Sequence, residues 1–201
     1  MLLRSVVLPV TATSRRDLVE RLVQLLVGLF LYGVALGFMV RGGIGVAPWD
    51  VLALGLAEQT GLRYGVMTVV VSIVVLLLWI PLRQRVGLGT VLNALLVGPS
   101  ADLALALIPQ PASVWIGAPM FVFGLLLLSF ATGLYIAADF GPGPRDGLMT
   151  GLVRRTGWAV WLVRTLIEGG VLLIGFLLGG PVGVGTVLFA FGVGPLIGWF
   201  L

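Results

Sequence analysis

Two aspartates that follow Gly/Pro-rich stretches are the first residues whose type and spacing could do chemistry. Asp50 ends the motif G-V-A-P-W-D, and Asp146 ends the motif G-P-G-P-R-D. A proline suits the first position of a helix, where its missing N–H costs nothing, and a carboxylate in the first turn meets free N–H groups and the positive end of the helix dipole. We therefore expect short helices that begin at Pro48 and Pro144 and are capped by Asp50 and Asp146. The candidate site residues from these motifs are Pro48, Trp49, Asp50, Pro144, Arg145 and Asp146.

A second set of reactive side chains lies in an apolar run near the C-terminus. Arg164 and Glu168 are one helical turn apart and share a face. Because an ionised group near the middle of a bilayer costs roughly 2.5–3.5 kcal/mol, such a pair is seldom accidental. It is either a substrate or proton contact that faces a cavity or a structural ion pair, and the sequence leaves both interpretations open.

A third candidate is Asn93, the only asparagine in the chain. With Thr90, Val97 and Ser100 it forms one stripe of an apolar run. The stripe either lines a pathway or makes hydrogen bonds between helices.

The composition indicates the class of protein that carries these residues. Of its 201 residues, 59% are hydrophobic and 10% are charged, and the mean hydropathy is +1.17. Soluble domains carry about 25% charged residues, so this composition indicates an integral membrane protein. The chain contains no Cys, His or Lys, which argues against an enzyme, a metal site or a bound cofactor. The net charge of +4 is a topology signal and not a sign of nucleic-acid binding.

Six apolar runs are candidates for membrane spans, and the last of them is short. They are 22–40, 64–82, 88–108, 117–138, 159–178 and 184–201. The segments 41–63 and 139–157, which hold the two aspartate motifs, contain charged residues and cannot span.

The chain also repeats itself. When it is shifted by 96 residues, Gly, Pro, Asp and Thr positions of the two halves coincide without a gap, including Pro48 with Pro144 and Asp50 with Asp146. Each unit contains three spans, which is an odd number, so the second unit must be inverted relative to the first. The sequence thus predicts an all-α integral membrane protein with six transmembrane helices, arranged as two inverted three-helix repeats that each carry a short broken or re-entrant helix.

The arginines predict the orientation of this arrangement. A cytoplasmic N-terminus places most of them inside, as the positive-inside rule requires. We expect a cytoplasmic tail at 1–21, a first repeat at 22–108, a linker at 109–119 and a second, inverted repeat at 120–201.

The short segments allow three interpretations. Half-length helices with Gly/Pro breaks at matching places of two inverted halves are typical of transporter binding sites. They could instead be amphipathic helices lying flat at the interface, with the aspartates as simple caps. Two aspartates could also form a protease dyad, but this requires carboxylates in contact. Trp49, Tyr64, Trp115 and Trp158 lie near the expected span ends, where interface anchors are common.

Several motifs together resemble the YczE-type bacterial membrane proteins, a family akin to YitT. They are G-x-x-P-W-D after the first span, G-P-x-P-R-D-G-L-M after the fourth, R-x-x-x-E at 164–168 and G-G-P-V-G-x-G-T at 179–186. The resemblance covers about Val27 to the end. It implies a multi-pass protein of the bacterial inner membrane whose members usually continue past the final span, and it supplies no reaction.

These observations favour a small secondary transporter or permease for an unidentified small polar metabolite. The alternative is a non-transporting membrane partner or assembly factor within a larger complex. The expected partners are the lipid bilayer, a small-molecule substrate and a second copy of the chain. A polar cavity at mid-depth distinguishes the two functions, because only the transporter requires one.

Overall fold

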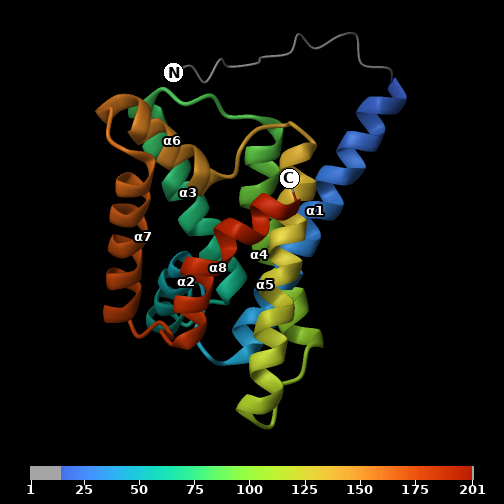
Figure 1. Ribbon diagram of the computed structural model, residues 1–201, viewed down its shortest axis with the longest axis vertical. Helices are drawn as coiled ribbons and strands as arrows, with labels where there is room; N and C mark the ends of the chain where they lie inside the picture. Colours follow the sequence, from blue (N-terminus) through green and yellow to red (C-terminus); the bar gives the residue numbers. More distant parts are fainter. Residues whose placement is uncertain (1–14, 201) are drawn as a thin grey trace.

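The computed structural model describes residues 15–200, and in this range it is helical (Figure 1). The helices are α1 Arg15–Gly42, α2 Pro48–Thr60, α3 Tyr64–Leu82, α4 Leu88–Leu107, α5 Val114–Ala137, α6 Pro144–Thr156, α7 Val160–Leu177 and α8 Val184–Phe200. Helices α1, α3, α4, α5 and α7 are long and apolar enough to cross a bilayer, whereas α8 is apolar but has 17 residues. The fold is therefore that of an all-α, multi-pass membrane protein.

Two boundaries differ from those expected from the sequence. Helix α1 begins at Arg15, inside the segment expected to be a tail, and α5 begins at Val114, inside the expected linker 109–119. The α1 extension is a polar continuation of an apolar helix, because hydrogen bonding within a helix continues past the point at which hydrophobicity ends. The α5 extension, Val114 to Ile116, is itself apolar. The expected tail at 1–14 lies outside the described residues.

Helices α1 and α5 pack side by side along the centre and run in opposite directions (Figure 1). A β-carbon built on Gly28 would lie 2.9 Å from the backbone nitrogen of Tyr135, whereas one built on Gly42 would lie 2.8 Å from the carbonyl oxygen of Gly117. Residue numbers therefore rise along α1 as they fall along α5. Small residues at the contact permit this close approach, as in other membrane helix pairs.

The short helices α2 and α6 begin and end at equivalent positions of the two repeats. Each starts at a proline and ends before a glycine with left-handed backbone, Gly61 with φ 70° and Gly157 with φ 71°. This confirms the prediction of short helices that begin at Pro48 and Pro144. The left-handed glycines stop both helices, since residues with a β-carbon seldom adopt this conformation.

The prediction that the two aspartates cap these helices is wrong. The capping positions are Ala47 and Gly143, and neither helix start has a side-chain capping hydrogen bond. The Asp50 and Asp146 carboxylates accept hydrogen bonds from tyrosines of other helices instead. Each carboxylate has a tyrosine hydroxyl as its partner, and Asp50 also has the Arg145 guanidinium. A local sequence pattern cannot show these partners.

In each half of the chain, the start of the last helix is hydrogen-bonded to the loop that precedes the short helix of the other half. The Gly185 N–H at the start of α8 donates to the Ile44 carbonyl at 2.7 Å, and the Gly89 N–H at the start of α4 donates to the Phe140 carbonyl at 2.9 Å. The Thr90 hydroxyl adds a bond of 2.8 Å to the Pro142 carbonyl. These bonds satisfy backbone groups in the broken segments, which would otherwise be costly in an apolar environment.

The contact between α3 and α4 is closer than the equivalent contact of the second half. A β-carbon on Gly98 of α4 would collide with the Gly65 carbonyl of α3, but one on Gly194 of α8 would meet nothing within 4 Å. The repeat equivalent of Gly65 is Trp161 of α7, which is 69% exposed. The close α3–α4 contact therefore has no counterpart between α7 and α8.

Alanine substitutions at these equivalent glycines should therefore have unequal effects. We expect Gly98→Ala to lower the free energy of unfolding by about 1–3 kcal/mol, because the added methyl group overpacks a backbone contact. Gly194→Ala, its matched control, should be neutral or slightly stabilising, since alanine is the better helix former. Unfolding of the two purified variants in the same detergent measures the difference, and equal losses would contradict the close α3–α4 contact.

Candidate functional site

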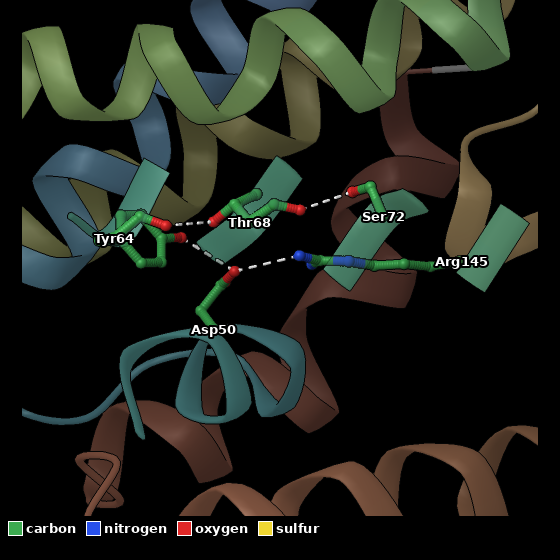
Figure 2. Close-up of polar contacts among 5 residues, drawn as sticks. All are labelled: Asp50, Tyr64, Thr68, Ser72 and Arg145. Carbon is green, nitrogen blue, oxygen red and sulfur yellow. Dashed lines mark hydrogen bonds and ion pairs between the residues drawn. The ribbon is translucent and has the colours of Figure 1, made fainter. Parts of the chain in front are cut away.

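The N-terminal turns of α2 and α6 meet inside the protein, where a buried ion pair joins them. The Arg145 guanidinium lies 3.4 Å from Asp50 Oδ1, which also accepts a hydrogen bond of 3.0 Å from the Tyr64 hydroxyl (Figure 2). The Asp50 side chain is 1% exposed and that of Arg145 is 21% exposed. Asp50 Oδ2 is buried and has no hydrogen-bond partner within residues 15–200. The pair links the two halves of the chain through their broken segments.

Arg145 also lies over an aromatic ring. The guanidinium carbon is 5.3 Å from the centroid of Trp49, which is the distance of a cation–π contact. Trp49 and Arg145 occupy equivalent positions of the two repeats. The contact therefore forms where the repeats face one another, and it orients Arg145 toward Asp50.

The second aspartate has different partners from the first. Asp146 Oδ2 accepts a hydrogen bond of 3.1 Å from the Tyr135 hydroxyl. None of the ion pairs within the described part of the chain includes Asp146. The Tyr135 ring in turn packs edge-to-face on Tyr32, with ring centroids 6.2 Å apart. Equivalent carboxylates are thus paired in one half and supplied only with a phenol in the other.

The predicted pair on α7 is present and faces the same region. Arg164 Nε lies 2.9 Å from Glu168 Oε1, and the two side chains are 43% and 24% exposed. Both line cavities that Trp49, Arg145 and Asp146 also line. The equivalent residues on α3, Thr68 and Ser72, donate their hydroxyls to backbone carbonyls of their own helix (Figure 2).

Three small cavities surround Arg145 and Asp146. The first, of about 50 Å³, is lined besides these two by uncharged polar residues that include Thr68, Ser72 and Asn93. The second and third, of about 100 and 110 Å³, contain Arg164 and Glu168. A water occupies about 30 Å³ in the liquid, so these cavities fit a few waters or a small solute.

The charges of the site do not cancel. Asp50, Asp146 and Glu168 supply three negative charges, whereas Arg145 and Arg164 supply two positive ones. The N-termini of α2 and α6 add partial positive charge. Within residues 15–200, no group of three or more His, Cys, Asp or Glu side chains could hold a metal ion. The arrangement can orient a small polar molecule and hold or release a proton.

Most of the sequence-predicted site residues come together here. The first cavity is lined by Pro144, Arg145, Asp146 and Asn93. Pro48, the first residue of α2, is buried and does not line any of the three cavities. The aspartates do not touch one another as a protease dyad would, since the structure pairs Asp50 with Arg145 and Asp146 with Tyr135.

Sequence reasoning missed the tyrosines. The chain has three, and Tyr32, Tyr64 and Tyr135 all lie at this site. Tyr64 and Trp49 were expected to be interface anchors, but they are 5% and 8% exposed and pack in the interior. Trp115 and Trp158 are exposed, as anchors are. Tyrosine is rare in this apolar chain, and a buried phenol hydroxyl requires a hydrogen-bond partner. The three tyrosines were therefore the signal that the sequence offered.

Comparisons with known proteins place these features in a family. An uncharacterized protein of Haemophilus influenzae is 40% identical over 177 residues, which are 88% of this chain and 81% of that protein. The uncharacterized membrane protein YczE of Bacillus subtilis is 29% identical over 91% of this chain and 86% of its own length. This confirms the resemblance to the YczE-type proteins. No solved structure matches. A family model described as a family of unknown function, DUF6198, matches residues 19–201, and the chain therefore belongs to that family.

Proposed function

We propose that this protein is a small secondary transporter or permease for a small polar metabolite in the bacterial inner membrane. The observation that carries the proposal is a charged cluster that includes the buried Asp50 and at which the N-terminal turns of two broken helices face one another and line cavities. Charged groups inside a membrane protein are expensive and usually mark a substrate or ion pathway. Discontinuous helices at equivalent places of two repeats are the usual way in which transporters build such a site.

The geometry supports an inverted relation between the repeats. Equivalent helices α1 and α5 are antiparallel, and α2 and α6 have equivalent bounds. A rotation that superposes antiparallel helices has its axis perpendicular to them, in the plane of the membrane. We expect residues 24–105 to superpose on 120–201 after a rotation of about 180° about such an axis. Helix α8, about 26 Å long at 1.5 Å per residue, is counted as the sixth span, with local bilayer thinning covering the difference.

The orientation follows from the arginines and is open to a direct test. The chain has no cysteine, so each single-cysteine variant carries one thiol for labelling. In right-side-out membrane vesicles, a membrane-impermeant maleimide should label Ser113→Cys in the exposed loop before α5. It should label Arg85→Cys, between α3 and α4, only after the vesicles are permeabilised. The reverse pattern would place the N-terminus outside.

The cavities favour transport over a purely structural role in a complex. A membrane partner or assembly factor has no need of cavities lined by Arg145, Asp146, Arg164 and Glu168. Cavities of 50 to 110 Å³ restrict a bound molecule to a small one, and the charged side chains in their walls favour a polar one.

The proposal is tested by uptake into proteoliposomes. Purified protein is reconstituted, the vesicles are offered pools of small polar metabolites, and the contents are identified by mass spectrometry. We expect one class of solute to accumulate above the level in empty liposomes. Uptake equal to that of empty liposomes for every pool, in both the presence and the absence of a proton gradient, would overturn the proposal.

A further inference from the structure

The two equivalent aspartates of the site are not in equivalent states. Asp50 accepts a hydrogen bond from Tyr64 and forms an ion pair with Arg145. Asp146 has the Tyr135 hydroxyl alone among the hydrogen bonds and ion pairs of its side chain within residues 15–200. Arg145, although next to Asp146 in sequence, is directed across the repeat boundary to Asp50. Asp146, which is exposed, is therefore the carboxylate of the site that lacks a close cationic partner.

Asp146 also lies where the cavities adjoin. It lines all three of them, together with Arg145. On one side are the uncharged groups Thr68, Ser72 and Asn93. On the other side is the pair Arg164–Glu168. A proton or water that passes between the two sides meets this carboxylate.

The groups around Asp146 suit a proton better than a metal ion. A β-carbon built on Gly143 would lie within 3.4 Å of Asp146 Oδ2, the Tyr135 hydroxyl and Asn93 Nδ2, so these three polar atoms surround one small space. Na⁺ and other hard cations need several oxygen ligands, and here one carboxylate, one phenol and one amide are available. A carboxylate and a phenol already joined by a hydrogen bond can accept and release a proton with little rearrangement.

Arg145 and Arg164 attract the Asp146 carboxylate, but neither forms a close ion pair with it. Tyr32 of α1, Tyr64 of α3 and Tyr135 of α5 are neutral phenols that face the cluster from three sides. Asp50 of α2 is paired with Arg145 of α6, and Glu168 of α7 is paired with Arg164 of the same helix. With both guanidiniums engaged, the cluster carries one excess negative charge. An excess charge inside a largely apolar protein is unfavourable, so the cluster gains by taking up a cation, and Asp146 is its carboxylate without an ion pair.

We infer that Asp146 binds and releases the coupling proton of this protein, an inference that rests on the proposed transport function. The carboxylate takes one proton from water in the first cavity and returns it to water on the side of Arg164 and Glu168, or the reverse, so no other reactant is consumed. Asp50, paired with Arg145 and hydrogen-bonded to Tyr64, joins the two halves.

Infrared difference spectroscopy of the purified full-length protein, recorded across a pH series, tests this inference without a substrate. A protonated carboxyl group has a C=O stretching band that the carboxylate lacks. We expect the wild type to show such a band that appears and disappears reversibly at a pH above the range in which the exposed carboxyl groups titrate. Asp146→Asn should abolish it, whereas Glu168→Gln should retain it. Asp50→Asn should also retain it but move its midpoint to lower pH, because the released Arg145 then stabilises the Asp146 carboxylate.

A second variant keeps the test informative if Asp146→Asn does not fold. Tyr135→Phe removes the hydrogen bond to the carboxylate and should raise the midpoint by about one pH unit, the order expected for one hydrogen bond to a charged group. A band that survives Asp146→Asn, that disappears in Asp50→Asn, or that responds to Na⁺ rather than pH would overturn the inference. If the band behaves as expected and no solute is transported, the proposed function fails and the proton site stands. If transport is found while Asp146 stays ionised at every pH, the proton site alone fails.

Discussion

Replacing Arg145 by glutamine is expected to destabilise the protein by about 3–5 kcal/mol, the largest loss of stability that the structure predicts. The substitution leaves the Asp50 carboxylate, 1% exposed, without its cationic partner. Asp50 keeps the hydrogen bond from the Tyr64 hydroxyl, but a single phenol cannot offset a buried charge. The free energy of unfolding, followed by tryptophan fluorescence in a mild detergent, measures the loss.

A double substitution and an exposed control distinguish the contribution of the ion pair to stability from that of the individual residues. Arg145→Gln combined with Asp50→Asn removes both charges and should recover most of the lost stability, because no unpaired charge remains. Arg63 faces Asp102 at 3.9 Å with its side chain 81% exposed, so Arg63→Gln should cost no more than about 1 kcal/mol. A double variant that is no more stable than Arg145→Gln would show that the ion pair does not account for the loss.

Replacing Glu168 by glutamine is expected to reduce uptake to background while leaving expression and folding intact. The amide keeps the shape of the carboxylate but loses the charge that faces Arg164 and the two larger cavities. The Glu168 side chain is 24% exposed and that of Arg164 is 43% exposed, so the cost in stability is smaller than at Asp50. The solute identified in proteoliposomes serves as the probe, and its initial rate of uptake is measured.

Two variants control this experiment. Glu58→Gln makes the same chemical change at an exposed position near the end of α2 and should keep the wild-type rate. Arg164→Leu with Glu168→Met removes the whole pair, so we expect it to fold without transporting. Full uptake by this double variant would make the pair structural and remove it from the site.

The positions of the helices were largely predictable because their signals are local. Proline at a helix start and glycine at a helix end act within a few residues, so the bounds of α2 and α6 follow from the P-W-D and P-R-D motifs and the glycines at 61 and 157. The apolar runs likewise predicted the spans. Two helix starts differ: α1 continues into polar residues as far as Arg15, since helical hydrogen bonding does not require hydrophobic residues, and α5 includes the apolar residues from Val114.

The partners of the site residues were not predictable in this way. Asp50 and Asp146 follow the same motif, yet one is paired with Arg145 and the other with Tyr135. The difference comes from residues that the repeat does not share, since Arg145 is equivalent to Trp49 and Tyr135 is equivalent to Met39. Their meeting depends on how the two halves pack.

Packing between the short helices and the spans shows the same dependence. Gly147 of α6 lies against the ring of Trp79 on α3, whose indole N–H donates to the Pro144 carbonyl at 3.0 Å. In the other half the sizes are exchanged, with Val51 of α2 against Gly175 of α7. In a tightly packed interior, a large residue on one helix leaves room only for a small residue on the helix that it contacts.

The sequence by itself determined the membrane class, the internal repeat, the two broken segments and the residue types from which a site could be built. These properties follow from composition and from interactions over a few residues. The tertiary structure decided that Arg145 crosses to Asp50, that Asp146 lacks a close cation and that three tyrosines enclose the cluster. The reason is physical: the energy of a buried charge depends on every group within a few ångströms, and helices distant in the sequence supply those groups here.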